Sequence, residues 1–438
     1  MTIQTINYQD ADFDVRVAAV RDKLRAGGLT ATGEGTLDVP AIVDDILKDV
    51  AAHGDEALTR LEKKLDGADL TPQTIRVPRE RIESAHAAAE PEFLALVRRV
   101  IVNIRRYQES ILIQDPPMLR RGGRTLGVRY TPVERAAVYV PGGQALYPST
   151  VLMTVVPAQV AGVPEIAMVS PPRSDGDIDP MVLALAGELG VGEVYRLGGA
   201  QAIAALAYGT ESVKAVSKIV GPGNAFVAEA KRRVLGSVGI DSIAGPSEVF
   251  IVADDTADAT FIAADLLAQA EHNPGSAVLA TPSSDLAGAV KDELARRLPE
   301  LSRSEATAAC LEAYSAIIVT GTLDEACAVA DDFATEHLQI ITADDQATMS
   351  KIRNAGAIFL GSHTPVPTGD YYAGPSHVLP TGGTAKFFGP LSCNDFLKAS
   401  SVSRYDPEAL KEDGPDIIDF ATREGLTAHA EAVRKRLG

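Results

Sequence analysis

The sequence is poor in cysteine, has no long apolar run and carries no excess of positive charge. Its three cysteines form an odd total without CxxC spacing, which favours free thiols in a reducing cytoplasm over a disulfide framework. No apolar run approaches the length of a membrane span, and the first residues lack the basic and apolar regions of a secretory signal. The net charge of −18 argues against nucleic acids and anionic membranes as partners, because both would repel the chain. We therefore expect a soluble, cytoplasmic protein.

The residues that are present describe a large globular protein. The 438 residues are 46% hydrophobic, enough for a sizeable core and two or three domains. Apolar and charged residues alternate at helical spacing up to about residue 110. Strand-like runs then alternate with helical segments from 138 to 245 and again from 247 to 360, which indicates parallel sheets with helices on their faces. We predict an α/β fold with two Rossmann-like parallel-sheet units, a helical N-terminal region and a helical C-terminal tail.

Polar clusters in the C-terminal part of the chain are the strongest functional signal. They hold four of the seven histidines. Their members are Gln269 with His272, Glu336 with His337, Asp370 with His377, and His429. Nitrogen and oxygen ligands for one divalent ion, together with an acid/base pair, can be drawn from this set without a cysteine. This set of side chains predicts a metalloenzyme.

Two of these clusters are placed at the ends of predicted helices. Gln269 and His272 are three residues apart and share a helix face, and Asn273-Pro274-Gly275 ends that helix beside His272. The spacing alone is a weak metal signature. Glu336 and His337 end a helix just before a buried strand, where burial can adjust both pKa values for acid/base work. A chance surface pair remains an alternative there.

A long loop, TGDYYAGPSHVLPTGG, presents Asp370 and His377. Its glycines and prolines predict an ordered loop, and long ordered loops are usually functional. A related Gly-Pro turn precedes Ser247 and Glu248 in AGPSEVF.

Glycine turns follow three predicted strands, at 141–143, 198–202 and 221–224. Their backbone N–H groups and the helix N-termini behind them suit a pyrophosphate or another anion. The chain has no GxGxxG fingerprint, and glycine turns are common in α/β proteins, so these turns alone do not establish a dinucleotide site.

Eight motifs carry a resemblance to a known family. They are VYVPGG, GGAQAIAAL, VGPGN, AGPSE, LLAQAEH, EHLQI, GDYYAGPSHVLPTGG and EGLTAHA. In this order they resemble the L-histidinol dehydrogenases. The resemblance implies a zinc-dependent, NAD-linked, four-electron oxidation of L-histidinol through L-histidinal to L-histidine, the last step of histidine biosynthesis.

The resemblance also implies roles for individual residues. The zinc ligands correspond to Gln269, His272, Asp370 and His429. The acid/base pair corresponds to Glu336 and His337, with further substrate contacts at Ser247, His377 and Glu424. The NAD contacts correspond to Tyr139, Gln201 and Asn224. The family forms homodimers whose C-terminal segments cross to the other subunit, so His429 and Glu424 are expected to act in trans.

The expected domain organisation combines the pattern with this resemblance. Residues 1–30 would pack with the tail, and residues 31–137 with 247–390 would form the first α/β domain. Residues 138–246 would form the second, NAD-binding domain, and 391–438 a helical tail exchanged in the dimer.

Two other functions stay open. A related dehydrogenase of the same fold could act on another small alcohol, such as a sulfonated propanediol. A zinc hydrolase could use the same ligands with Glu336 as its base, but it would leave the glycine turns unexplained.

Overall fold

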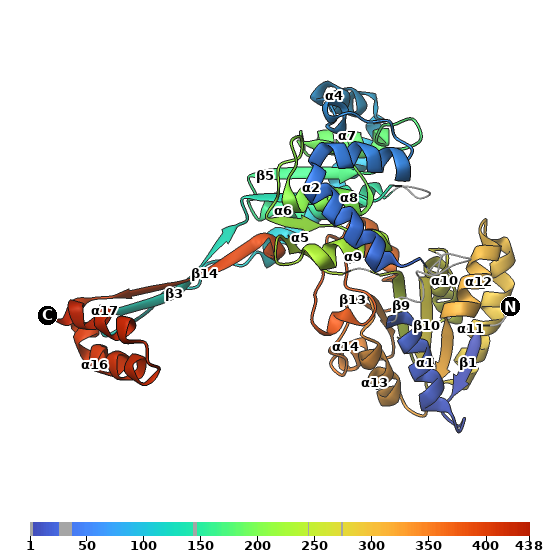
Figure 1. Ribbon diagram of the computed structural model, residues 1–438. Helices are drawn as coiled ribbons and strands as arrows, with labels where there is room; N and C mark the ends of the chain where they lie inside the picture. Colours follow the sequence, from blue (N-terminus) through green and yellow to red (C-terminus); the bar gives the residue numbers. More distant parts are fainter. Residues whose placement is uncertain (1–2, 26–36, 143–146, 244, 273–274) are drawn as a thin grey trace.

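Two α/β bodies and one projecting arm make up the molecule (Figure 1). The computed structural model describes residues 3–25, 37–142, 147–243, 245–272 and 275–438. The N-terminal strand belongs to one body, and the arm leaves the other body and carries the C-terminus. None of the described helices is long and apolar enough to cross a membrane. The predicted α/β fold with two parallel-sheet units is confirmed.

The first body is built on a six-stranded sheet in which every neighbouring pair is parallel. Its strands in spatial order are β1 (Gln4–Asn7), β11 (Ala316–Val319), β10 (Gly275–Thr281), β9 (Ser247–Ala253), β12 (His337–Ile341) and β13 (Ala357–Leu360). One face is covered by α10 (Ala259–Ala270), α11 (Ser284–Arg297) and α12 (Ser304–Tyr314). The other face is covered by α1 (Phe13–Arg25), α13 (Leu323–Phe333) and α14 (Asp345–Met349). Both faces are buried, which explains why strands such as β9 are almost continuously apolar.

The second body is built on a five-stranded parallel sheet. Its strands in spatial order are β6 (Val194–Arg196), β5 (Glu165–Ser170), β4 (Arg135–Tyr139), β7 (Lys218–Val220) and β8 (Gly239–Ile240). One face is covered by α4 (Arg79–Ala88), α5 (Pro91–Ile111), α6 (Pro148–Val160) and α7 (Pro180–Glu188). The other face is covered by α2 (Val39–Leu65), α8 (Gly199–Tyr208) and α9 (Ala225–Val234), with the short α3 (Pro72–Ile75) beside β6.

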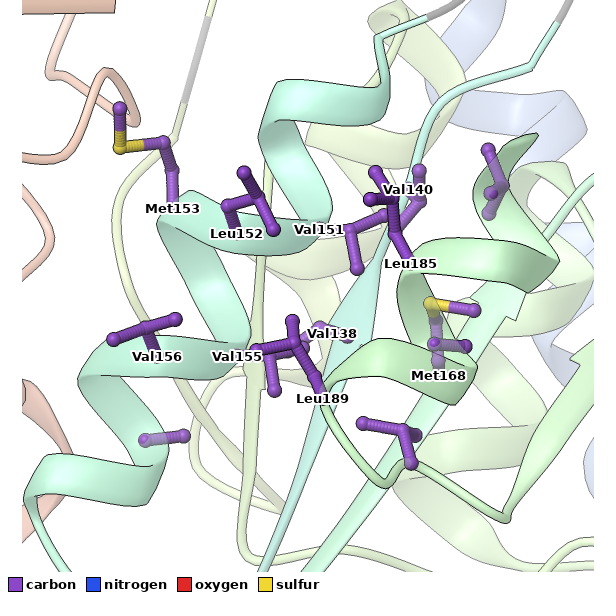
Figure 2. Packing of buried hydrophobic residues seen from close by; sticks show 14 of the residues in the cluster. Val138, Val140, Val151, Leu152, Met153, Val155, Val156, Met168, Leu185 and Leu189 are labelled. Atoms are coloured by element: carbon purple, nitrogen blue, oxygen red, sulfur yellow. The ribbon is translucent and has the colours of Figure 1, made fainter. Parts of the chain in front are cut away.

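Helix α6 shows how this core is made. Its residues 150–158 are all buried. Figure 2 shows Val151 and Val155 of α6 close to Val138 of β4 and to Leu185 and Leu189 at α7. A helix that is apolar all round must be enclosed on all sides, and α5, α7 and the sheet enclose α6.

The grouping of segments differs from the expected domains in two respects. Strand β1 pairs with β11 in the first body, whereas residues 1–30 were expected to pack with the tail. Helices α2, α4 and α5 pack on α8, α7 and α6 of the second body, whereas 31–137 was expected to join 247–390. Both sheets present similar apolar faces, so helical periodicity cannot tell which one a helix covers.

The arm corrects the expectation of a wholly helical tail. Strand β14 (Leu397–Tyr405) pairs antiparallel with β3 (Arg124–Pro132), which also pairs with β2 (Leu119–Arg121). Only beyond β14 does the chain form helices α16 (Pro407–Arg423) and α17 (Thr427–Leu437), which pack on each other far from both bodies (Figure 1). The alternation in LKASSVSRY is mostly polar on both faces, so it gives little strand signal.

Candidate active site

A cavity of about 660 Å³ lies between the two bodies. The second body contributes the carboxyl ends of its strands, at Tyr139 of β4, Gln201 after β6 and Asn224 after β7. The first body contributes the amino ends of its strands, because Ser247 and His337 are the first residues of β9 and β12. Ligand crevices in parallel sheets usually lie at the carboxyl ends. Only the second body follows that rule.

The chain makes a tight turn immediately before Glu336 and His337, the predicted acid/base pair. Helix α13 ends at Phe333, and Ala334 then adopts a left-handed conformation with φ of 51°. Glu336 therefore lies beyond the helix in the turn, not at its C-terminus as expected, and His337 begins β12. The left-handed alanine costs about 1–2 kcal/mol, which the packing of the buried strand must offset. The turn places both side chains in a buried position at the amino end of β12.

Hydrogen bonds fix the orientation of both members of the pair. Glu336 Oε2 accepts from the Ser247 hydroxyl (2.7 Å) and from the Glu248 backbone N–H (2.8 Å). His337 Nδ1 lies 2.9 Å from the Glu248 carbonyl oxygen, which can only accept, so Nδ1 carries the proton. The second nitrogen, Nε2, is buried without a hydrogen-bond partner among the described residues and lies 3.8 Å from Asp370 Oδ1. The imidazole thus presents Nε2 towards Asp370.

Burial and neighbouring charges shift both pKa values. Burial raises the pKa of Glu336, although the adjacent His337 opposes the shift. Burial lowers the pKa of His337, but the carboxylates of Glu336 and Asp370 outweigh it and raise that pKa to about 9. The two groups are therefore a strongly interacting acid/base pair.

Three of the four predicted metal ligands line the same cavity, namely Gln269, His272 and Asp370. Gln269 is the penultimate residue of α10, and its Nε2 is buried with no hydrogen-bond partner among the described residues. His272 follows α10, and burial lowers its pKa, which favours the neutral imidazole that binds metals. The expected helix end at 273–275 includes residues 273–274, which lie outside the described ones; α10 itself ends at Ala270.

The long predicted loop is tied to both bodies. The Ser376 hydroxyl donates to the Met153 carbonyl of α6 (3.0 Å), and the Gly382 N–H donates to Glu248 Oε1 (2.8 Å). His377 lies between the Asp370 carbonyl oxygen (3.1 Å from Nδ1) and the Thr150 hydroxyl (3.3 Å from Nε2). Burial lowers the pKa of His377. The loop therefore holds Asp370 and His377 against the cavity.

Glu424 and His429 are not part of this cavity. Glu424 caps the C-terminus of α16 and His429 lies in the first turn of α17, and both are exposed at the end of the arm. No group of three or more His, Cys, Asp or Glu in the described part of the chain could hold a metal ion. Within one chain, the predicted ligand set is therefore incomplete.

Tyr139, Gln201 and Asn224, the predicted cofactor contacts, line the other part of the cavity. The Gly199 N–H donates to the Tyr139 hydroxyl (3.1 Å), and the Gly198 N–H donates to Glu62 Oε1 (3.1 Å). The turn at 198–202 therefore uses these N–H groups internally, and the anion site suggested for them is not open. Part of the turn at 141–143 lies outside the described residues.

Sequence reasoning missed two residues that contact the predicted site residues. Glu248 is buried, and its backbone holds Glu336 through its N–H and His337 through its carbonyl oxygen. Its place beside Ser247 in AGPSEVF was the available signal. Thr150 contacts His377 from inside an apolar helix and had no signal.

A second cavity, of about 1120 Å³, adjoins the first and shares Gln269, His272 and Asp370 with it. Its wall includes an apolar face of α5 and three charged side chains. The apolar residues are Phe93, Leu96, Val97 and Val100, and the charged ones are Asp265, Glu271 and Arg303. The predicted metal ligands therefore line both cavities.

The turn at 221–224 allows a test of its backbone geometry. Gly221 has φ of +113°, and a Cβ there would lie 2.2 Å from the Tyr139 carbonyl oxygen. Gly221→Ala is expected to lower the free energy of unfolding by about 2–5 kcal/mol, from left-handed strain of about 1–2 and displaced backbone of about 1–3. Gly162→Ala is the matched control, because Gly162 has φ of +81° but no atom within 4 Å of a Cβ. Denaturant unfolding should show the larger loss at 221; equal losses would contradict the close contact.

Comparison with known proteins identifies the family. The sequence profile of the histidinol dehydrogenase family matches residues 31–437. Histidinol dehydrogenase of Rhodopirellula baltica is 48% identical, over 99% of this chain and 97% of that protein. Histidinol dehydrogenase of Geobacillus kaustophilus is 49% identical, over 95% of this chain and 98% of that protein. The crystal structure of histidinol dehydrogenase from Elizabethkingia anophelis superimposes with a TM-score of 0.89 at 32% identity, covering 99% of this chain and 98% of that one. The chain belongs to the histidinol dehydrogenase family, whose members are NAD-dependent oxidoreductases of histidine biosynthesis.

Proposed function

We propose that the chain catalyses the zinc-dependent, NAD-linked, four-electron oxidation of L-histidinol through L-histidinal to L-histidine. The observation that carries this proposal is the buried pair Glu336 and His337, which shares one cavity with Gln269, His272 and Asp370. The crevice along the second sheet adjoins the same pair and suits a dinucleotide. Family membership supports the substrate.

His337 acts as the base in the alcohol oxidation. Its Nδ1 proton is held by the Glu248 carbonyl, so Nε2 is the nitrogen that accepts the hydroxyl proton of the substrate. Nε2 has a free lone pair in the neutral imidazole, the form that predominates above the raised pKa of about 9. The proton leaves to Nε2 as the hydride leaves to NAD⁺, which gives the aldehyde. A positioned base of this kind contributes about 10²–10⁴-fold to the rate.

Glu336 acts in the second oxidation. Ser247 and the Glu248 N–H hold Oε2, which leaves Oε1 to accept a proton from water as that water attacks the aldehyde. Burial raises the pKa of Glu336, which makes it a stronger base than an exposed carboxylate. The hydrate then gives a hydroxyl proton to His337 Nε2 as its hydride leaves to a second NAD⁺, which yields the carboxylic acid. Cys310, Cys327 and Cys393 are all buried, so a thiolate route has no candidate among the described residues near the pair.

The donor set fits zinc. Gln269, His272 and Asp370 supply amide oxygen, imidazole nitrogen and carboxylate oxygen, and the unpartnered buried amide of Gln269 can turn its oxygen into the cavity. When bound, zinc would act as a Lewis acid that orients the substrate through its imidazole and amine. His429 would complete the site.

We propose that His429 and Glu424 come from a second copy of the chain in a homodimer. The tail exposes Phe420 (68%) and Leu426 (43%), and α17 ends with Arg434, Lys435 and Arg436. The second cavity offers a partly complementary surface, with the apolar face of α5 and with Asp265 and Glu271 outnumbering its one cation, Arg303. A tail that docked there would bring its polar residues to the predicted ligands.

Replacing the proposed fourth ligand tests the metal site. His429→Ala is expected to lower the zinc content and to weaken zinc affinity by at least about tenfold, because one of four ligands is lost. Elemental analysis after dialysis measures the zinc content of the variant. His53→Ala is the control, since His53 is an exposed histidine on α2. Zinc content equal to that of the control would remove His429 from the ligand set.

A mixed dimer tests whether the tail acts in trans. Chains with His429→Ala and chains with His272→Ala are each expected to be inactive as homodimers. Their mixed dimer should regain one intact site of two, formed by the body of the first chain and the tail of the second. If each tail served its own body, both sites of the mixed dimer would be defective and no activity would return.

The substrate is tested by a panel of alcohols assayed for NADH formation. We expect oxidation of L-histidinol in preference to dihydroxypropanesulfonate, because His377 and Ser247 line the cavity and Glu424 is expected to join them from the other subunit. The reverse preference would favour the related dehydrogenase, and failure to bind NAD⁺ would favour a hydrolase. We place the enzyme in the cytoplasm, with neither nucleic acid nor membrane as partner, on the strength of its acidic charge and buried free thiols.

A further inference from the structure

The first cavity has an end, away from the catalytic pair, that is built by helix α2. Ile42, Ile46 and Leu65 of α2 line it, together with Asp66 at the helix C-cap and Phe226 of α9. The other carboxylates of the cavity, on Glu336 and Asp370, belong to the catalytic end. No lysine or arginine is among the described residues that line the cavity. The α2 end is therefore apolar with a single acidic group.

Asp66 is held in place by buried neighbours. The side-chain amide of Gln201 donates from Nε2 to Asp66 Oδ2 (3.3 Å) and to Glu62 Oε1 (3.0 Å). Gln201 and Glu62 are 1% and 0% exposed. Gln201 Oε1 and Glu62 Oε2 have no hydrogen-bond partner in the described part of the chain. Gln201 is also a predicted cofactor contact. Asp66 is therefore hydrogen-bonded to a residue that lines the proposed dinucleotide crevice.

The negative charge of this cluster lies on the cavity side. Burial, followed by the nearby Asp66 carboxylate, raises the pKa of Glu62 to about 8. Burial also raises the pKa of Asp66, but Asp66 is only partly buried and lines the cavity, so its carboxylate is the charged group that a ligand would meet.

We infer that Asp66 selects NAD⁺ over NADP⁺ by accepting hydrogen bonds from the adenosine ribose hydroxyls and repelling a 2′-phosphate. This inference rests on the proposed function and adds a specificity-determining residue to it. A ribose diol is a pair of donors that suits a fixed carboxylate. A phosphate at the same place would meet a like charge and no cation. Ile42, Ile46 and Phe226 would flank the adenine ring.

The test is equilibrium binding of NAD⁺ and NADP⁺ to the intact enzyme by calorimetry. Wild type should bind NAD⁺ at least about tenfold more tightly, and Asp66→Asn should shrink that preference by at least about tenfold, mainly by tighter NADP⁺ binding. Asp69→Asn is the matched control, because Asp69 is exposed, pairs with Lys63 and does not line the cavity. A preference that changes less than about threefold in Asp66→Asn overturns the inference.

A second measurement needs no substitution, in case the variant does not fold. Wild type should bind ADP-ribose at least about tenfold more tightly than 2′-phospho-ADP-ribose. Equal binding of the two overturns the role of Asp66, while continued oxidation of L-histidinol with NAD⁺ would leave the proposed function intact. Failure of the wild-type enzyme to bind either dinucleotide would instead overturn the proposed function, and this inference with it.

Discussion

His337→Asn is expected to lower kcat by about 10²–10⁴-fold for both L-histidinol and L-histidinal. The asparagine amide can still donate to the Glu248 carbonyl, as Nδ1 of His337 does at 2.9 Å, so the fold of the turn is kept. What is lost is Nε2, the buried nitrogen with no partner in the described chain and 3.8 Å from Asp370. Steady-state NADH formation with saturating substrates measures the effect.

The control for this variant is His86→Asn. His86 lies on α4 and contacts Glu188 through Nε2 (2.8 Å), well away from the cavity lining. The His86→Asn variant should retain the wild-type kcat. A loss of less than about tenfold in His337→Asn would mean that another group takes the hydroxyl proton.

Glu336→Gln is expected to separate the two oxidations. The amide preserves shape and can still accept the hydrogen bonds from Ser247 and the Glu248 N–H, but it cannot take a proton from water. Oxidation of added L-histidinal should fall by about 10²–10⁴-fold, with a smaller loss for the alcohol step. Rapid-quench analysis should then show one NADH formed quickly at each site, followed by stalled aldehyde.

Ser247→Ala is the companion variant for Glu336→Gln. It removes only one donor to Oε2 and leaves the carboxylate, so its loss should be much smaller, about tenfold or less. If Glu336→Gln slowed the oxidation of histidinol and of histidinal equally, the assignment of Glu336 to the hydration step would be wrong.

The fold follows from sequence wherever the chain forms buried parallel strands. Segments such as Val249–Ala253 are short, apolar and flanked by helical patterns, which is the pattern of a sheet covered on both faces. Two strands could not be predicted from the sequence pattern. Strand β1 consists of four residues that gain their structure from pairing with β11, and β14 is polar on both faces and depends on β3. Local patterns do not carry such long-range pairing.

The site could be predicted as a set of residues but not as an arrangement. Motifs predict Gln269, His272, Glu336, His337 and Asp370, and all five line one cavity. The cavity is lined by the amino ends of strands in the first body and by the carboxyl ends of strands in the second. Local sequence patterns do not predict this arrangement, because it depends on how the two bodies pack. Nor does any pattern reveal the Glu248 backbone contacts.

We propose that one cavity carries out both oxidations with zinc. The decisive experiment counts NADH against L-histidine formed from L-histidinol, before chelation, after chelation and after zinc is restored. A four-electron oxidation predicts two NADH for each L-histidine, since each NAD⁺ accepts one hydride, and the donor set predicts loss on chelation and recovery with zinc. Release of L-histidinal with a single NADH, or full activity after the metal is removed, would contradict the account.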